Sequence, residues 1–302
     1  MNYTLIVLTK KSNIFSYVGK TLDVETFFKF DVGNSKFVRR TVRALYYFLH
    51  IFHLQKLILG KWYKYRESNK IVFMDIVSIN DYIVKFVKKH KNSSLIYLWN
   101  IYKPIKRYKI LLKIKENVFS FDKNDCEIYG FNYFHGFYPN IKFHNERLEF
   151  DLFFCGQDKG RKELIYKICK SVDNSKNKIL IIDNIKKNIN YSEYINLLIK
   201  SKCIIEIRQK GQTGDTLRTL ESIVFSKKII TNNIKIVKEP YYKVENIFVI
   251  EDPENINIAK LNDFMKSEYV GIQSSDIESF YPENWIKSIF ELNDNNLDNT
   301  IK

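Results

Sequence analysis

The sequence predicts an α/β protein with two domains. Apolar segments of strand length alternate with segments of helical periodicity along most of the chain, a pattern typical of parallel sheets covered by helices. In two places an apolar run ends in a basic, glycine-containing loop that leads into a helix, once after residues 148–155 and once after residues 201–207. With 302 residues, the chain is also long enough for two domains of ordinary size.

The first half predicts a parallel sheet with polar residues at its strand ends. Its predicted strands are residues 3–9, 70–73, 94–99 and 117–121, and its predicted helices are residues 80–90 and 106–113. Asp75, Asn100 and Asp122 follow three of these strands. Parallel sheets bind ligands at the carboxyl ends of their strands, so these residues are candidates for lining one crevice. The alternative for each residue is an Asx turn or a helix cap.

Residues 37–66, FVRRTVRALYYFLHIFHLQKLILGKWYKYR, combine many apolar side chains with basic residues toward both ends. A basic helix rich in Leu, Phe, Tyr and Trp is able to lie in a membrane interface. The alternative is a core helix whose Lys and Arg ends are solvated. We favour the core helix for residues 45–58 and the membrane interface for the two basic ends. The predicted membrane-facing residues are Arg39, Arg40, Arg43, Lys61, Trp62, Lys64 and Arg66.

The aromatic segment at residues 129–138, with the polar residues that follow it to Arg147, is interpreted as the crossing between the domains. We therefore expect an N-terminal domain at residues 1–145 and a C-terminal domain at residues 146–302. The predicted strands of the second domain are residues 148–155, 179–183, 201–207, 229–231 and 246–250. Its predicted helices are residues 162–171, 191–201, 217–228, 253–268 and 280–292.

The stretch from Glu206 to Asn233 predicts a strand, a glycine-containing loop and a helix that begins near Thr216. Free N–H groups and the helix dipole make such a helix start an anion site. Glu221 lies three residues after Arg218, on nearly the same helix face. An arginine suits a diphosphate, and a carboxylate suits a sugar diol. The alternative is an ordinary strand–turn–helix unit with a surface Arg–Glu pair.

Positive charge is concentrated in the first half of the chain. Residues 1–150 contain 26 Lys+Arg and 12 Asp+Glu, whereas residues 151–302 contain 23 and 22. This asymmetry indicates that the first half meets an anionic partner, which is either nucleic acid or an acidic membrane surface.

The sequence offers little support for metal, disulfide or membrane-spanning elements. The four cysteines form no C-x-x-C pair and no secretory signal is recognisable, so we expect a reducing cytoplasm. His50 and His53 are one helical turn apart but have no nearby third ligand. No apolar run of about 20 residues is free of charge, so we expect no membrane-spanning helix.

Several segments, in this order along each half, resemble GT-B glycosyltransferases, most closely the bacterial enzymes that build capsular, lipopolysaccharide or related surface glycans. They are SLIYLWN and FSFDKNDCEIYGFNY in the first half, and FFCGQDKGR, IEIRQKGQTGDTLRTLES and KKIITNN in the second. The resemblance covers most of residues 70–250. It implies two Rossmann-like domains facing across a cleft, with the nucleotide-sugar donor on the C-terminal domain and the acceptor on the N-terminal domain. It also implies that the terminal helix, about residues 280–292, returns to the first domain.

The resemblance further implies roles for individual residues. A general base must face the acceptor hydroxyl in an inverting enzyme, and the candidates for this base are Asp122 and Asp75. The resemblance implies no metal or other cofactor, since GT-B enzymes usually hold the diphosphate with basic side chains, and the chain contains no D-x-D triplet. The implied donor-binding residues are Gly156, Lys159 and Arg161 in a first loop, Arg208, Gln212, Thr213, Gly214, Thr216 and Arg218 around the phosphates, and Glu221 on the ribose or sugar.

We therefore expect a glycosyltransferase that moves a sugar from a nucleotide-diphosphate sugar to a lipid-linked glycan acceptor in bacterial surface polysaccharide biosynthesis. Its expected location is the cytoplasm, peripheral at the anionic inner face of the cell membrane. One alternative is a basic nucleic-acid-binding protein, although the chain lacks helix-turn-helix, zinc and RNP-type signatures and we do not expect nucleic acid as a partner. The other alternative is a GT-B-fold sugar-nucleotide epimerase, which would need no acceptor.

Overall fold

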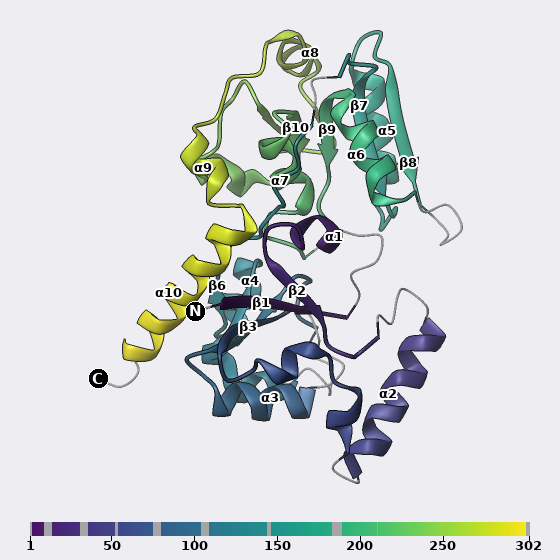
Figure 1. The fold of residues 1–302 in the computed structure, drawn as a ribbon. Coiled ribbons are helices and arrows are strands. Elements are labelled where there is room, and N and C mark those ends of the chain that lie inside the picture. Colours follow the sequence, from purple (N-terminus) through teal and green to yellow (C-terminus); the bar gives the residue numbers. More distant parts are fainter. Residues whose placement is uncertain are drawn as a thin grey trace. The chain divides into compact units, whose positions relative to one another are not determined.

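The computed structural model describes residues 2–8, 14–30, 36–51, 54–74, 80–103, 109–143, 146–182, 189–209 and 211–299. The chain forms two compact units. Unit 1 comprises residues 1–135 together with residues 282–302, and unit 2 comprises residues 136–281 (Figure 1). Each unit has its own parallel sheet, so the predicted α/β fold class with two Rossmann-like domains is confirmed. The units divide between residues 135 and 136, ten residues before the boundary predicted from the sequence.

Unit 1 contains a six-stranded parallel sheet in the order β2-β1-β3-β4-β5-β6. Its strands are β1 (Asn2–Val7), β2 (Asp23–Thr26), β3 (Asn69–Met74), β4 (Ser94–Leu98), β5 (Val118–Ser120) and β6 (Asn132–Tyr133). Its helices are α1 (Phe15–Val18), α2 (Lys36–Ile51), α3 (Asn80–Lys89), α4 (Lys123–Tyr129) and α10 (Pro282–Asn299), with 3-10 helices η1 (Gln55–Ile58), η2 (Lys61–Lys64) and η4 (Lys109–Asn117).

The two faces of the unit 1 sheet are covered by different helices. Alternate residues of a strand point to opposite faces, and on β3 Ile71 and Phe73 belong to a core cluster that also includes Trp62 and Phe86. This cluster draws its apolar side chains from α2, η2, α3 and η4. The opposite face contacts α10, where the Trp285 ring lies 4.9 Å from the Tyr97 ring, edge to face.

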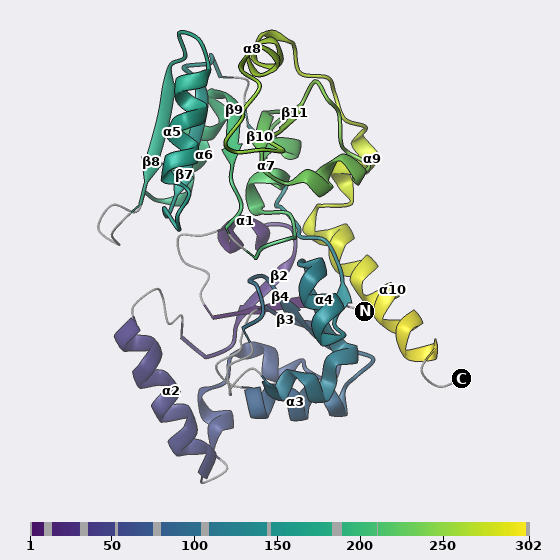
Figure 2. The same cartoon turned by 180° about the vertical axis from the view of Figure 1, so that it is seen from behind.

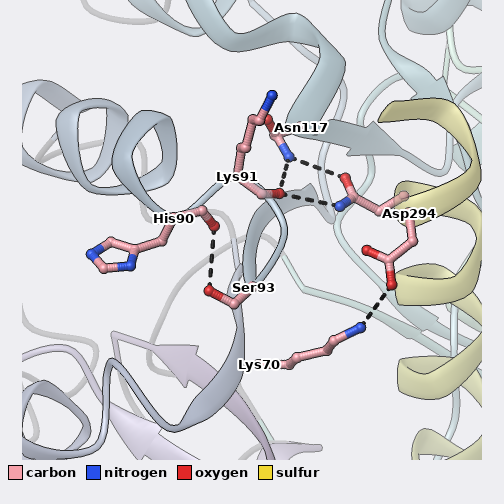
Figure 3. Close-up of polar contacts among 7 residues, drawn as sticks. Lys70, His90, Lys91, Ser93, Asn117 and Asp294 are labelled. Carbon is pink, nitrogen blue, oxygen red and sulfur yellow. Dashed lines mark hydrogen bonds and ion pairs between the residues drawn. The ribbon is translucent and has the colours of Figure 1, made fainter. Parts of the chain in front are cut away.

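Helix α10 is bound to unit 1 by the polar contacts that Figure 3 shows. Its apolar side chains are buried as well. Buried Asn293 accepts a hydrogen bond from Asn117 Nδ2 at 3.1 Å and donates to the Lys91 carbonyl at 3.2 Å. Lys70 of β3 forms an ion pair with Asp294 at 2.9 Å. The terminal helix, expected at residues 280–292, thus belongs to unit 1 and extends to Asn299.

Unit 2 contains a five-stranded parallel sheet in the order β11-β10-β9-β7-β8, with β11 labelled in Figure 2. Its strands are β7 (Phe150–Gly156), β8 (Asn177–Ile181), β9 (Ser201–Glu206), β10 (Lys228–Thr231) and β11 (Ile247–Val249). Its helices are α5 (Lys162–Ser171), α6 (Tyr191–Ile199), α7 (Leu217–Val224), α8 (Ile258–Lys266) and α9 (Ser274–Glu278), with the 3-10 helix η6 (Ile234–Lys238).

Helices cover both faces of the unit 2 sheet, as expected for a doubly wound fold. Phe154 of β7 and Ile205 of β9 share a core cluster with Ile165 of α5 and Phe264 of α8. The neighbouring residue Phe153 points to the other face, where its ring lies 5.6 Å from that of Tyr194 on α6.

The segment at residues 37–66 does not form the core helix expected for residues 45–58, because Leu45, Phe48 and Ile51 are exposed. Helix α2 ends at Ile51, and the short 3-10 helices η1 and η2 follow. Gly60 separates them with an extended backbone, and a Cβ added at Gly60 would overlap the Thr26 carbonyl oxygen, so only glycine fits there. Across the ranges that the structure describes, no helix has both the length and the apolar composition needed to cross a membrane.

Candidate functional site

A pocket of about 510 Å³ lies in unit 2 at the carboxyl ends of β7 and β9. These two strands are neighbours in the sheet although β8 lies between them in the sequence. The strand order therefore reverses at this point, which is where open α/β sheets bind their ligands. The pocket is lined by Lys159, Gly160, Arg161, Leu164, Ile207, Arg208, Gln209, Gln212 and Asn232.

The loop after β7 presents an open backbone surface to the pocket. Lys159 and Gly160 both adopt left-handed conformations, with φ of 48° and 77°. A lysine in this region carries a conformational cost that glycine does not. A Cβ added at Gly160 would have no atom within 4 Å, so the space beside this residue is open. Asp158 caps α5 through hydrogen bonds from the backbone N–H groups of Arg161 and Lys162.

Arg161 joins the two loops of the pocket. Its guanidinium donates to the carbonyl oxygens of Gln157 and Asp158 in the first loop and of Ile207 in the second, at 2.5, 3.1 and 2.7 Å. The residue is 8% exposed. Burial lowers the pKa of Arg161 to about 10, and the nearby charge of Arg218 acts in the same direction. Arg161 therefore shapes the pocket while it adds positive charge to its wall.

Arg208 plays a similar part in the loop after β9. Its guanidinium donates to the Thr213 carbonyl and to Asn233 Oδ1, both at 2.5 Å. Its backbone N–H donates to Asn232 Oδ1 at 2.9 Å, which connects β9 to the end of β10. The described residues of the pocket lining thus include three cationic side chains and no carboxylate, so the pocket suits an anionic ligand.

Helix α7 begins near Thr216 as predicted, but the Arg218 side chain does not line the pocket. Thr216 is the N-cap, and its hydroxyl accepts a hydrogen bond from the Arg218 N–H at 3.1 Å. The Arg218 guanidinium donates to the Cys155 carbonyl at 2.5 Å and lies over the Phe154 ring at 4.9 Å. A Cβ added at Gly156 would overlap this guanidinium, so Gly156 makes room for Arg218.

Glu221 is fully buried and takes part in a network of tyrosines. The hydroxyl of Tyr194 donates to Glu221 Oε2, and that of Tyr138 donates to Oε1 at 3.5 Å. Burial raises the pKa of Glu221 to about 7, although the tyrosine hydrogen bonds and Arg218 oppose this shift. The predicted contact of Glu221 with a ribose or sugar is therefore corrected: its carboxylate faces the interior of unit 2.

The structure brings together four of the ten predicted donor-binding residues: Lys159, Arg161, Arg208 and Gln212 line the pocket. The pocket lining does not include the other six, which are Gly156, Thr213, Gly214, Thr216, Arg218 and Glu221. Sequence reasoning missed Gly160, Leu164, Ile207, Gln209 and Asn232. Asn232 directly follows β10, so the rule that strand ends carry ligand residues would have selected it.

The two candidates for the catalytic base have different outcomes. Asp122 is fully buried and is the N-cap of α4, accepting hydrogen bonds from the backbone N–H groups of Asn124 and Asp125 at 3.0 and 3.3 Å. We therefore assign Asp122 to helix capping instead of catalysis. Asp75 lies outside the described residues.

The predicted membrane-facing set is corrected at Trp62. This side chain is in the core of unit 1, and its indole N–H donates to the Phe27 carbonyl at 3.0 Å. Arg66 is partly buried, lies over the Tyr63 ring at 4.1 Å and donates to the Tyr63 carbonyl. Arg40, Lys61 and Lys64 are exposed, Arg43 is partly exposed, and the side chain of Arg39 lies outside the described part of the chain.

Comparison with known proteins gives a similarity at the level of structure only. Searches against protein-family models and against curated proteins find no match. Among solved structures, the chain is similar to one described as T4 phage BGT in complex with UDP and Mn²⁺. The two have a TM-score of 0.47 and 12% sequence identity, and the similarity covers 99% of this chain and 95% of that chain.

This comparison corrects the expectation that no metal is required. The expectation followed from the fold resemblance and from the lack of a D-x-D triplet, yet the solved structure of similar fold is a complex with Mn²⁺. Fold class and the missing triplet therefore do not establish metal independence. Within the ranges that the structure describes, no group of three or more His, Cys, Asp or Glu residues is placed to hold a metal ion.

Proposed function

We propose that this protein is a glycosyltransferase whose unit 2 binds a nucleotide-diphosphate sugar. The observation that supports this proposal is the pocket at the sheet's reversal point, with Lys159, Arg161 and Arg208 in its wall. A diphosphate carries the charge that such a wall attracts, and glutamine and asparagine side chains beside it offer hydrogen bonds to a ribose or a base. We place the diphosphate in this pocket instead of at the start of α7.

The chemistry of the transfer explains why the cations matter. The bond between the sugar's anomeric carbon and the β-phosphate oxygen breaks, and a bond from an acceptor hydroxyl oxygen to that carbon forms. The hydroxyl proton passes to a base, and the nucleoside diphosphate leaves with added negative charge. Cations fixed beside the diphosphate stabilise this developing charge more than they stabilise the bound substrate, which lowers the barrier.

A ligand panel tests the donor proposal. Thermal unfolding is measured with nucleosides, nucleoside monophosphates and nucleoside diphosphates, each with and without Mn²⁺. A ligand present at a hundred times its Kd stabilises the fold by about 2.7 kcal/mol. We expect the stabilisation to grow with the number of phosphates. Equal shifts for nucleoside and nucleoside diphosphate would contradict a diphosphate site.

A matched pair of variants locates the site. Lys159→Gly removes the ammonium group while keeping the left-handed backbone, and we expect at least tenfold weaker binding of the diphosphate without loss of stability. Asn174→Gly is the control, because Asn174 also has φ of 48° and does not line the pocket. Unchanged binding by Lys159→Gly would place the diphosphate elsewhere.

Product analysis separates glycosyl transfer from the alternatives. Incubation with a panel of nucleotide sugars should give transfer to an added acceptor or slow hydrolysis. Epimerised nucleotide sugar would support the epimerase, and salt-dependent RNA binding without any sugar-nucleotide reaction would support the nucleic-acid-binding protein.

We further propose that the acceptor is a lipid-linked glycan of bacterial surface polysaccharide biosynthesis. The support is the resemblance of the sequence segments to such enzymes and the positive charge of residues 1–150. Lipid-linked glycans extracted from bacterial membranes should accept the sugar at a higher rate than the same glycans released from their lipid. Equal rates would contradict a lipid-linked acceptor.

A further inference from the structure

Helix α2 has apolar side chains on two opposite faces. Val42 and Tyr46 belong to the core cluster of unit 1. On the other side, positions 37, 41, 44, 48 and 51 form one stripe, because residues spaced by three and four lie on the same face of a helix. All five of these positions are exposed.

The outward stripe is strongly apolar at three positions. Phe37 is 76% exposed, Phe48 is 56% exposed and Ile51 is 71% exposed. Leu45, beside the stripe, is 41% exposed, and Leu57 of η1, which follows α2 in the chain, is 58% exposed. A run of large apolar side chains facing water in this way is typical of an interaction surface.

The charge around this face indicates what it binds. Residues 36–66 contain eight Lys and Arg residues and no Asp or Glu. Arg40 is exposed on α2, Lys56 is exposed on η1, and Lys61 and Lys64 are exposed on η2. An apolar helix face with basic residues nearby combines the two attractions that hold a helix on an anionic lipid surface: burial of apolar area at the acyl boundary and attraction to charged headgroups.

We propose that unit 1 docks on an anionic membrane surface through the outward face of α2. Phe37, Phe48 and Ile51 enter the boundary between headgroups and acyl chains, and Lys56, Lys61 and Lys64 contact anionic headgroups. This differs from the surface predicted from the sequence, since Trp62 packs in the core and the inserting residues are those of the α2 stripe. The docking does not depend on the donor pocket of unit 2.

Vesicle flotation of the full-length protein tests the apolar contribution. We expect wild-type protein to float with vesicles that contain phosphatidylglycerol and to remain unbound with phosphatidylcholine alone. The double variant Phe37→Ser/Ile51→Ser should bind at least about tenfold more weakly, since two large side chains no longer bury apolar area. The control is Ile234→Ser/Val244→Ser, which removes side chains of 58% and 65% exposure from unit 2 and should bind as wild type.

A second pair of variants tests the charge. Lys56→Gln/Lys61→Gln/Lys64→Gln should weaken binding about a hundredfold, because each basic residue near an anionic surface contributes a factor of about five. The control is Lys85→Gln/Lys88→Gln/Lys89→Gln, which removes the same charge from exposed positions on α3. If both triple variants lost vesicle binding equally, net charge alone would explain the loss, and the proposed docking site would be wrong.

Other outcomes would also overturn the proposal. Equal binding of wild type to neutral and anionic vesicles would remove the role of charge. Normal flotation of Phe37→Ser/Ile51→Ser, together with a change from dimer to monomer in gel filtration, would assign the face to a second copy of the chain. If Phe37→Ser/Ile51→Ser floated normally but no longer bound RNA, the outward face of α2 would be assigned to nucleic acid.

Discussion

The two units can be compared strand by strand, because β1 to β5 of unit 1 and β7 to β11 of unit 2 follow the same order in their sheets. In both, the second strand lies on one edge and the order reverses between the first and third strands. The units differ most in the connection from the second to the third strand. In unit 2 it spans residues 182–200, and the part that the structure describes contains α6, whereas in unit 1 it spans residues 27–68 and contains α2, η1 and η2.

One sheet topology thus supports two kinds of surface. In unit 2 the connection is short. Arg161 and Arg208 donate hydrogen bonds to backbone carbonyls of the loop after β9, which forms part of the pocket wall. In unit 1 the long connection turns a second apolar face toward solvent. The loops after β1 and β3, where the equivalent pocket of unit 1 would lie, are outside the described residues.

All three tryptophans belong to unit 1, so the stabilities of the two units can be measured separately. Tryptophan fluorescence follows the unfolding of unit 1, whereas far-UV circular dichroism follows both units. A loss of stability can therefore be assigned to one unit by comparing the two unfolding midpoints.

The largest effect is expected for Arg161→Ala in unit 2. Loss of its three hydrogen bonds leaves the buried Ile207 carbonyl and two partly buried carbonyls without a charged donor, so we expect a loss of about 3–5 kcal/mol of unfolding free energy. The circular dichroism midpoint should fall while the tryptophan midpoint stays unchanged. Arg161→Lys should not restore stability, because an ammonium cannot reproduce the planar fork of donors. Full stability of Arg161→Ala would show that the loops do not need this connection.

A smaller effect, dependent on pH, is expected for Glu221→Gln. The folded pKa of about 7 lies above the ordinary 4.5, so the folded protein binds a proton that the unfolded chain releases between these values. Stability from Glu221 therefore falls as pH rises from about 4.5 to about 7, by roughly 3 kcal/mol. The variant should lack this decrease in unfolding free energy.

The difference between wild type and Glu221→Gln isolates this residue. Burial also raises the pKa of Asp125, to about 6, and that of Glu206, but both remain in the variant. Parallel stability curves from pH 4 to pH 8 would show that Glu221 does not titrate in this range.

Asn293→Ala tests the attachment of α10 to unit 1. The substitution removes one buried and one partly buried hydrogen bond, so we expect a loss of about 1–2 kcal/mol, seen as a lower tryptophan midpoint. Asp294→Asn is the control, because its ion pair with Lys70 is partly exposed and should contribute less than about 1 kcal/mol. A fall confined to circular dichroism would contradict the assignment of α10 to unit 1.

The smallest effect is expected for Asp122→Asn. Asparagine caps a helix about as well as aspartate, so stability should change by less than about 0.5 kcal/mol. Glycosyl transfer should also continue at the wild-type rate if Asp122 is a cap only. A folded Asp122→Asn protein without transferase activity would restore Asp122 as the catalytic base.

The sequence predicted the elements whose signals are local. Helix α5 occupies the predicted residues 162–171, because its apolar periodicity, the preceding Gly160 and the Asp158 cap all lie within one short segment. The strands β3, β4, β7 and β9 were likewise predicted to within a few residues from continuous apolar runs. Helix α4 was missed because KNDCEIY has few apolar residues, and β6 was missed because it has only two residues.

The roles of single side chains were harder to predict, because they depend on partners far along the chain. Trp62 is fixed by the carbonyl of Phe27, and Glu221 by hydroxyls of Tyr138 and Tyr194. Arg218 has the right residue type for a phosphate, yet the Cys155 carbonyl and the Phe154 ring hold it. Spacing on one helix cannot show which of these partners a side chain meets in the folded protein.

The attachment of α10 has a consequence for synthesis on the ribosome. Unit 2 is one continuous segment, residues 136–281, so all of its sequence emerges before α10 is translated. Unit 1 begins first but needs residues 282–299 to cover one face of its sheet. The N-terminal unit is therefore the last to be completed. While unit 2 is synthesised, the sheet face of unit 1 that carries Tyr97 lacks its contact with Trp285 of α10.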